Sequence, residues 1–454
     1  MKIEMHCSGK HRHPCRLILL LISIVLLQTA IPPSLSAMDL MEAYTRAKKS
    51  DPLFGSSVYE LEAARTLSKQ GRSFLLPKIQ ISGSTSRYEF DTAPSAYQDH
   101  TGYSSGINLR QPLFNLSKFY EFRQYNIRET IGDVRFVSAE QDLILRVAEA
   151  YFNGMAARKL LELIDTEKKA VSEQLEQAKR MFQAGVATIT DVHDAEARYD
   201  SILSREVENK YNLEIKIQAL KKIVGIEPDG LSFLREDTPL RVPEPESLEG
   251  WIEIAKKHNP ILKSYAYNVD NDKEELRKNK AQHLPTVDLI AGYSWTNTIS
   301  EYLKSQSIVY RSIGIQVNMP VFSGGYISAK VKESQARFEQ TKKEYENALL
   351  DNVQKLTEAF LGIKASIVRI NMLLTAVRSA STSLYSNKKG LIAGVRTIVD
   401  VLNAERELHD VSGRLLKARY DYLMNMLRLK FYAGTLSEED VLMINQWLQT
   451  SQVR

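Results

Sequence analysis

GVATITD occupies Gly185–Asp191 and GVRTIVD occupies Gly394–Asp400, so one heptapeptide motif occurs twice in the chain. Long proline-free stretches rich in helix-forming residues lie on both sides of each copy. A glycine between two such stretches can end a helix in the left-handed conformation, and a Thr or Asp shortly after it can cap the next helix. We therefore expect Gly185 and Gly394 to mark the tips of two helical hairpins.

The similarity between the two halves of the chain extends well beyond these tips. An offset of 209 residues aligns Ala150–Gly225 with Ala359–Gly434 without a gap, and an offset of 208 aligns Pro52 with Pro260. Self-similarity at a constant offset indicates a duplicated structural unit. The chain is therefore expected to contain two copies of one fold.

The N-terminal segment 1–37 has the three parts of a secretory signal peptide. Basic residues precede the apolar stretch Leu17–Leu27, which is too short to span a membrane, and small residues follow as far as Ala37. Cys7 and Cys15 are the two cysteines of the sequence. Both lie in this segment, so we expect the exported chain to have neither a disulfide nor a thiolate nucleophile.

The expected organisation after the signal peptide is repeat, linker, repeat. The linker, residues 227–249, holds four of the fourteen prolines. The first repeat, 38–226, and the second, 250–454, should each contain a helix, two strands and a long helical hairpin, and a short helix should close the second. No later segment reaches eighteen consecutive apolar residues, so we expect no transmembrane helix and expect strands to enter any membrane.

Alternating steps of three and four residues between apolar positions predict coiled-coil seams in both hairpins. The proline-free stretch 116–184 would span roughly 100 Å as one helix. The first seam includes one polar member, Lys168. Its other members are Leu161, Ile164, Val171, Leu175, Ala178 and Phe182.

Apolar and polar residues alternate in two stretches of each repeat, as in half-buried β-strands. The predicted strands are 78–90, 102–114, 286–298 and 307–322. Val287, Leu289, Tyr293 and Trp295 share one face of the third and are expected to face lipid, with aromatics near the interface. Four strands cannot close a barrel, and an open sheet leaves unpaired edges in lipid, so several chains would have to share one barrel. The plainer interpretation is two soluble hairpins packed on helices.

Other function classes have little support in the sequence. The net charge of +5 comes without a cluster of basic residues, so nucleic-acid binding is not expected. No metal-ligand spacing, phosphate-binding loop or nucleophile motif occurs, and we expect neither an enzyme nor a cofactor or metal. His193 and His409 are expected to be solvated residues on helix surfaces.

The sequence resembles the TolC family of outer-membrane channel-tunnels over essentially the whole exported chain. The stretches that carry the resemblance are AGVRTIVDVLNAE (393–405), GVATITDVHDAEARYD (185–200), HLPTVDL (283–289) and VNMPVFSGG (317–325). The resemblance implies a mainly α protein with a membrane β-barrel. In it, the long antiparallel coiled-coil hairpins of a homotrimer form an α-helical tunnel in the periplasm, and four strands per chain make a twelve-stranded barrel in the outer membrane.

The implied function is the exit duct of a tripartite export system. Its cargo would be unfolded proteins in type I secretion, small toxic molecules in efflux, or both. Its partners would be a periplasmic adaptor (membrane fusion protein), an inner-membrane ABC or RND translocase, and outer-membrane lipid. An alternative from another class is a periplasmic coiled-coil adaptor or structural spacer with no pore. The strand pairs with interface aromatics favour the duct.

The resemblance also implies a gate at the periplasmic end. Arg396 corresponds to the family's tip arginine, expected to link to Thr190 or Asp191 in a neighbouring hairpin. Asp400 corresponds to a carboxylate of the entrance constriction, where a ring of acids favours cations. A plainer interpretation of Asp191 and Asp400 is that they are first-turn acids that favour the helix dipole.

Two positions depart from the family's gate. Asn403 stands where the family has a second ring aspartate, and Leu391 stands where it has a gating tyrosine. Asp194, at the repeat-equivalent position in the first copy, could supply the missing charge. Leu391 cannot donate a hydrogen bond, so we expect a looser lock.

Overall fold

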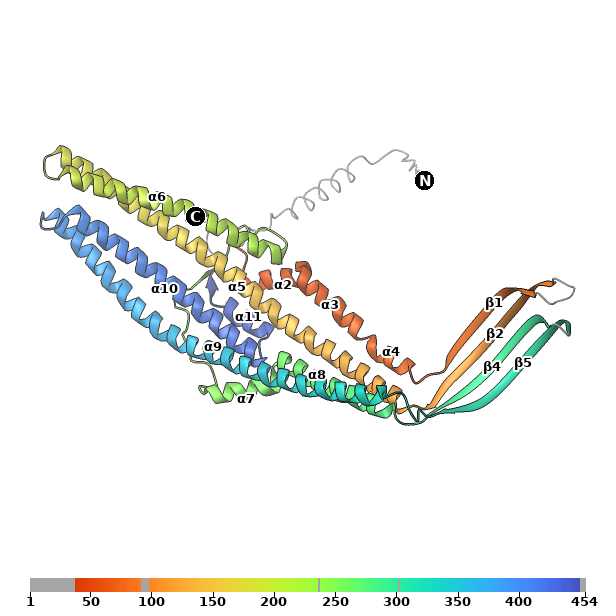
Figure 1. Cartoon of the computed structure of the whole chain (residues 1–454). Helices are drawn as coiled ribbons and strands as arrows, with labels where there is room; N and C mark the ends of the chain where they lie inside the picture. The colour runs from red at the N-terminus through yellow and green to blue at the C-terminus, as the bar shows by residue number, and fades with distance from the viewer. Residues whose placement is uncertain (1–36, 91–97, 236, 301–302, 450–454) are drawn as a thin grey trace, which may run out of the picture.

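The computed structural model describes residues 37–90, 98–235, 237–300 and 303–449. The segment expected to be a signal peptide lies outside them, except for Ala37. The molecule is elongated, with the tips of two helical hairpins at one end and a four-stranded sheet at the other (Figure 1). Helices thus occupy one end of the molecule and strands the other.

Four long helices form the two hairpins. α5 (Leu116–Gln183) runs antiparallel to α6 (Ile189–Val224), and α9 (Tyr326–Ile392) runs antiparallel to α10 (Ile398–Ala433). α5 has 68 residues and α9 has 67, so each is about 100 Å long. The shorter helices are α2 (Leu40–Ser50), α3 (Pro52–Ala64), α4 (Leu67–Ser73), α7 (Leu248–His258), α8 (Pro260–Ala281) and α11 (Glu438–Asn445).

Two helices expected to be nearly continuous are divided at an Asx-Pro pair. Asp51 caps α3 by accepting a hydrogen bond from the Phe54 backbone, and Pro52 takes the first helical position. Asn259 caps α8 in the same way, with Pro260 behind it. Proline lacks an N–H and clashes with a preceding turn, so it starts a helix here instead of continuing one.

The sheet has the strand order β1-β2-β4-β5, with every neighbouring pair antiparallel. Its strands are β1 (Lys78–Phe90), β2 (Gln98–Phe114), β4 (Thr286–Ser300) and β5 (Leu303–Asn318). The prediction that the last strand reaches Phe322 was wrong, because Pro320 cannot donate a ladder hydrogen bond. β1 and β5 are the edges of the sheet, and neither is paired on its outer side by another described strand.

The pairing register assembles one apolar face from all four strands. Ile79, Leu109, Ala291 and Ile313 are successive partners across the sheet. Paired residues point to the same side, and residues two apart on one strand share that side. Val287, Leu289, Tyr293 and Trp295 therefore belong to this apolar face. Asp288 and Ser294 belong to the opposite, polar face, where Asp288 accepts hydrogen bonds from the Arg110 guanidinium at 2.6 and 3.1 Å.

The four long helices lie side by side in the order α6, α5, α10, α9 (Figure 1). α6 and α9 are therefore the outer helices of this layer. One 18-residue stretch of α9 is apolar enough to cross a membrane by length and composition, yet only 22% of it is buried. This follows because α9 carries apolar residues on two faces. One face packs on α10, and Leu361, Val368 and Met372 are exposed on the other.

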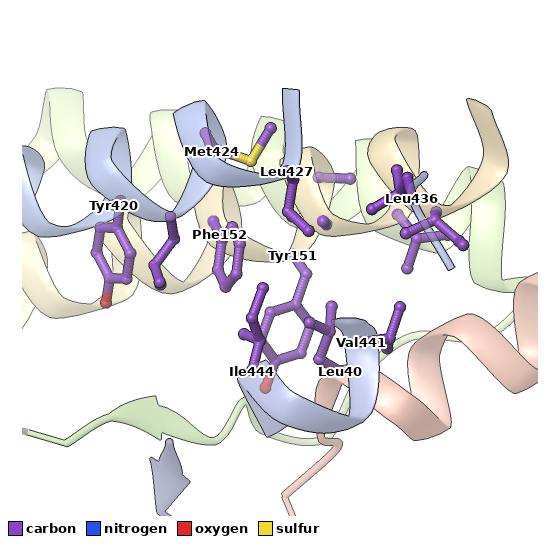
Figure 2. Close-up of a cluster of buried hydrophobic side chains, with 14 of the residues drawn as sticks. Leu40, Tyr151, Phe152, Tyr420, Met424, Leu427, Leu436, Val441 and Ile444 are labelled. Atoms are coloured by element: carbon purple, nitrogen blue, oxygen red, sulfur yellow. The ribbon is translucent and has the colours of Figure 1, made fainter. Parts of the chain in front are cut away.

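The main core joins both hairpins to the short helices at mid-length. Tyr151 of α5 is fully buried and lies beside Leu40 of α2 and Ile444 of α11 (Figure 2). Its hydroxyl donates to the Met38 carbonyl at 2.9 Å. Within the segment between the two hairpin units, β3 (Phe233–Leu234) pairs with β6 (Leu448–Gln449) near the C-terminus. The first and last described segments and the middle segment are thus anchored to one core.

Candidate gate at the hairpin tips

Both hairpin tips are built by the same backbone motif. Gly185 and Gly394 have φ values of +74° and +77°, in the left-handed region that favours glycine. The next residue in each tip donates its N–H back into the finished helix: Val186 to the Met181 carbonyl and Val395 to the Gly390 carbonyl, both at 2.9 Å. Each long helix therefore ends through a glycine C-cap before the chain reverses.

A capping box starts the returning helix of each hairpin. In the first tip, Asp191 accepts a hydrogen bond from the Thr188 backbone at 2.8 Å, and the Asp191 backbone donates to the Thr188 hydroxyl. Thr397 and Asp400 repeat this arrangement in the second tip. Hydrogen bonds from Thr397 hold the pKa of Asp400 below its ordinary value, and the nearby charge of Arg396 adds to the effect. Both acids thus have a structural role in the first turn.

One chain does not bring the predicted gate link together. The side chain of Arg396 is exposed and folds back so closely over Gly390 that a Cβ there would lie 2.6 Å from the Arg396 Cγ. Within the described ranges, neither the Arg396 guanidinium nor the Thr190 hydroxyl has a hydrogen-bond or ion-pair partner, although the Arg396 backbone N–H donates to the Gly390 carbonyl at 3.2 Å. Only one oxygen of Asp191 is used by the capping box. The groups expected to form the link remain available to another copy of the chain, and that link stays a prediction.

Asp194 and Asn403 are exposed at equivalent positions of the two tips. Each lies three residues after the capping acid of its helix, and residues three apart share a helix face. Asp194 therefore lies beside Asp191, and Asn403 beside Asp400. The first hairpin presents two carboxylates along this face and the second presents one.

Leu391 is buried in an apolar cluster that joins the two hairpins. Only 8% of it is exposed, and it packs in the same cluster as Ile398 and Leu402 of the following helix. The other buried members are Ile164, Val171, Leu175, Ala178, Val192, Ala195, Ile202 and Val401. Leu391, expected to leave the gate without a hydrogen bond, thus belongs to the apolar cluster that includes residues of both hairpins. The sequence analysis identified the missing hydroxyl at Leu391, but it did not predict that this side chain is buried.

Buried ion pairs lie near this cluster, and sequence reasoning missed them. Glu167 of α5 is 1% exposed and binds Arg198 and Arg205 of α6 at 2.7 and 3.0 Å. In the other hairpin, Lys388 lies 2.8 Å from the buried Glu405. Glu167 immediately precedes the seam residue Lys168 and so occupies a heptad g position, where interhelical salt bridges form. That register could have identified it.

His409 was expected to be solvated, and that expectation was wrong. Its side chain is half-buried on α10, close enough to sense the charges of Glu167 and Arg205 on the other hairpin. Burial lowers the pKa of His409, although Glu167 and Glu405 oppose the shift. His193, in contrast, is exposed, with its Nδ1 3.3 Å from Glu196. Only one of the two histidines therefore lies between the hairpins.

Comparison with known proteins gives consistent matches over both halves of the chain. The family model described as "Outer membrane efflux protein" matches residues 43–226 and 251–435. The chain is 33% identical over 419 residues to the outer membrane protein TolC of Vibrio cholerae, covering 92% of this chain and 95% of the relative. It is 31% identical over 414 residues to the alkaline protease secretion protein AprF of Pseudomonas aeruginosa, covering 89% and 86%.

The same architecture is found among solved structures. The crystal structure of CusC superposes with a TM-score of 0.78, covering 88% of this chain and 93% of that one, at 16% sequence identity. At this identity the likeness concerns the fold. The long hairpins and the four-stranded sheet are therefore an arrangement already seen in experimentally determined proteins.

Proposed function

The chain belongs to the outer membrane efflux protein family, and from this membership we propose that three copies assemble into one duct, gated at the hairpin tips. It is a transport protein of the outer membrane, with its helical part in the periplasm, and serves as an exit duct for export. The alternative of a periplasmic adaptor or spacer without a pore finds no support in the relatives.

The trimer proposal rests on open edges in two parts of the molecule, the sheet and the layer of long helices. β1 and β5 are the sheet edges, and α6 and α9 are the outer helices. Unpaired strand edges in lipid are costly, since no water satisfies their backbone groups. If β5 of each copy pairs with β1 of the next, three four-stranded sheets close a twelve-stranded barrel. The same operation brings α9 against the next copy's α6.

The outer helices carry apolar surface at matching heights, which supports this closure. Val207, Tyr211 and Ile215 are exposed along α6, and Val368 and Met372 are exposed along α9. Met372 lies twenty residues before the end of α9, and Val207 lies eighteen residues after the start of α6. Both distances are counted from the hairpin tips, so the two exposed surfaces lie at nearly the same height along the long helices. Exposed apolar stripes at helical spacing are typical of a helix–helix interface.

We assign the apolar face of the sheet to lipid and its polar face to the lumen. Val287, Leu289, Tyr293 and Trp295 would then face the hydrocarbon layer, with the aromatic pair near the headgroups, as in outer-membrane barrels. On this assignment, Asp288 and Ser294 line the lumen. The membrane span therefore begins just beyond the end of the long helices.

The proposed gate combines a polar link between copies with the apolar cluster within each copy. Arg396 of one copy would bind Thr190 or Asp191 of its neighbour, because a guanidinium and a carboxylate make oriented, charge-assisted hydrogen bonds. Asp400, with Asp194 or Asn403 nearby, would line the constriction. Within each copy, Leu391 would hold the two hairpins together.

Unfolded polypeptide is the cargo that the relatives favour. Two of them are named as protease secretion proteins, at 31% and 29% identity, against 24% for a relative named as an efflux protein. The family's own description, efflux, makes small toxic molecules a second candidate. In either case we propose a periplasmic adaptor and an inner-membrane ABC or RND translocase as partners, since the duct itself holds no energy source.

Light scattering of the detergent-purified protein tests the assembly. The expected mass is three times that of the exported chain, and a stable monomer would contradict the proposal. Deletion of the chromosomal copy tests cargo: loss of a secreted protease with unchanged drug resistance indicates polypeptide, and the reverse indicates efflux.

A further inference from the structure

Arg311 is a charged residue on the apolar face of the sheet. Its strand neighbours on that face are Ile313 and Val309, and its cross-strand partner is Tyr293. The guanidinium lies over the Tyr293 ring, 5.7 Å from the ring centre. Such stacking orients a guanidinium without neutralising it. A cation is thus held in a fixed place on a surface that otherwise suits hydrocarbon.

No described side chain on the apolar face balances this charge. Across the described side chains of the apolar face, from Ile79 on β1 to Val317 on β5, there is no Asp or Glu. Arg311 is exposed, and no ion pair to it is formed within the described chain. Arginine facing the middle of a bilayer costs roughly 2–4 kcal/mol, and the cost falls to about 0–1 kcal/mol near the interface. Arg311 should therefore lie at an interface and bind an anion there.

The geometry of the strands sets the depth of Arg311. Arg311 lies seven residues from Asn318, the residue at which β5 ends. With a rise of about 3.3 Å per residue and a strand tilt of about 40°, this separation corresponds to a height of about 18 Å along the membrane normal. Exposed Met319, Val321 and Phe322 continue the apolar surface below Asn318. An apolar band of about 25 Å that includes them has its upper edge at Arg311. Trp295, in the next cross-strand pair on the same face, then lies at the headgroup level that tryptophan prefers.

We infer that Arg311, oriented by Tyr293, binds the phosphate of an anionic membrane lipid at the outer edge of the barrel. A guanidinium and a phosphate match through paired hydrogen bonds, and the stacked ring holds that fork in place. The lipid chains would lie against the apolar rows below it. The inference rests on the proposed lipid-facing orientation of this face and adds a specific headgroup to it.

Quenching of Trp295 fluorescence by brominated lipid tests the inference. The full exported chain, as the assembled protein, is reconstituted in phosphatidylcholine that contains either brominated phosphatidylcholine or brominated phosphatidic acid. The other two tryptophans, Trp251 and Trp447, lie in the helical part and give an unquenched background. One basic residue near a membrane surface is worth about a fivefold preference for anionic lipid. We expect that preference in the original chain and its loss in Arg311→Gln.

Matched variants separate the site from general effects. Ile313→Gln, on the same face one pair below, should keep the preference. Arg311→Lys should keep part of it, because lysine retains the charge and loses the fork; this variant maintains the test if Arg311→Gln does not assemble. Excess inorganic phosphate in the buffer should leave the preference unchanged, whereas its loss there would assign the site to free phosphate and overturn the lipid assignment.

The outcomes also distinguish the inference from its premise. If neither brominated lipid quenches Trp295, the face is not in lipid and the proposed orientation fails. If both quench it equally in the original chain, the face is in lipid and the Arg311 site is refuted. An equal preference in the original chain and Arg311→Gln would refute it as well.

Discussion

At the scale of single residues, the structural roles and the proposed gating roles in the two hairpin tips belong to neighbouring side chains. Glycine ends each helix, threonine and aspartate start the next, and the residue after Val395 is the exposed Arg396. The capping box uses one oxygen of the aspartate, so the other remains free for a partner. A tip can therefore keep its fold when its contact with a neighbouring copy breaks.

The first prediction concerns Arg396. Arg396→Ser should raise single-channel conductance in planar bilayers, because it removes three proposed links per trimer. Within the chain it removes only the packing over Gly390 and the effect of the charge on Asp400. Each exposed pair is worth no more than about 1 kcal/mol, so the links should favour the closed gate without preventing it from opening. Asp400→Asn is the matched control: asparagine keeps the cap acceptor, so conductance should stay low while cation selectivity falls. Unchanged conductance in Arg396→Ser would remove this residue from the gate.

A second prediction concerns the packing that replaces the family's tyrosine. Leu391→Ala should cost about 2–5 kcal/mol of hairpin packing, as expected for a buried leucine, and should increase the frequency of channel opening. Ile392→Ala is the control, since Ile392 is 79% exposed in the next position. Equal effects of the two substitutions would show that the apolar cluster does not hold the hairpins together.

Sequence reasoning recognised the tip residues and missed most of their contacts. Gly185 and Thr188 could be assigned a backbone role because left-handed turns and N-caps are local and depend on few residues. The burial of Leu391 and the ion pairs of Glu167 depend on how two hairpins, far apart in sequence, are packed. Local patterns do not contain that information.

At the scale of elements, alternation predicted all four strands, and two Asx-Pro pairs divided helices. β1 covers the predicted residues 78–90, whereas β2 and β5 each begin four residues before their predicted starts. The helix expected at the start of the first repeat is three helices, α2, α3 and α4. Alternation over many residues specifies a strand strongly. The effect of an internal Asx-Pro pair depends on whether the Asx side chain turns to cap the next helix, and the pattern leaves both outcomes open.

A third prediction tests the two faces of β4. Leu289→Arg should make membrane insertion less favourable by roughly 2–4 kcal/mol, because it puts a cation near mid-bilayer. Ser294→Arg, on the opposite face, should insert normally and change conductance instead. Urea titration of folding into vesicles measures the first effect and bilayer recording measures the second. Comparable insertion of both variants would contradict the assignment of faces.

A fourth prediction concerns the pH dependence of hairpin packing at His409. The pKa of His409 is lowered in the packed state, so that state favours the neutral ring. Glu167 of α5, Arg205 of α6, and Glu405 and Asp410 of its own helix are the charged groups that act on it. The stabilisation is complete above the ordinary value of about 6.5 and is lost as pH falls toward the lowered value.

Conductance is therefore expected to rise between pH 7.5 and pH 5.5, since protonated His409 favours separated hairpins. His409→Gln should flatten this dependence, because glutamine fills similar space without titrating. His193→Gln, at an exposed position of the first hairpin, should leave it unchanged. If the conductance of His409→Gln still depended on pH, a titratable group other than His409 would be responsible.

At the scale of the whole molecule, the duplication explains the open edges on which the proposed assembly rests. Two copies of a helix–strand–hairpin unit give a layer of four long helices and a sheet of four strands, each open at both edges. The sequence predicted that several chains must share a barrel, because four strands cannot close. The number of copies was predicted from the family resemblance. The edges of one chain indicate which surfaces could meet, but they do not indicate how many chains assemble.

Disulfide cross-linking between the outer helices tests this closure most directly. We expect the exported chain to have no cysteine of its own, since Cys7 and Cys15 lie in the expected signal peptide. Val207→Cys and Met372→Cys lie on opposite outer helices, so they cannot bridge within one chain. Mild oxidation of the double variant in native outer membranes should give covalent dimers and a closed trimer as the largest product, and neither single variant should give the trimer. Monomers alone from this pair and from Tyr211→Cys with Met372→Cys, or a ladder beyond three chains, would contradict the account.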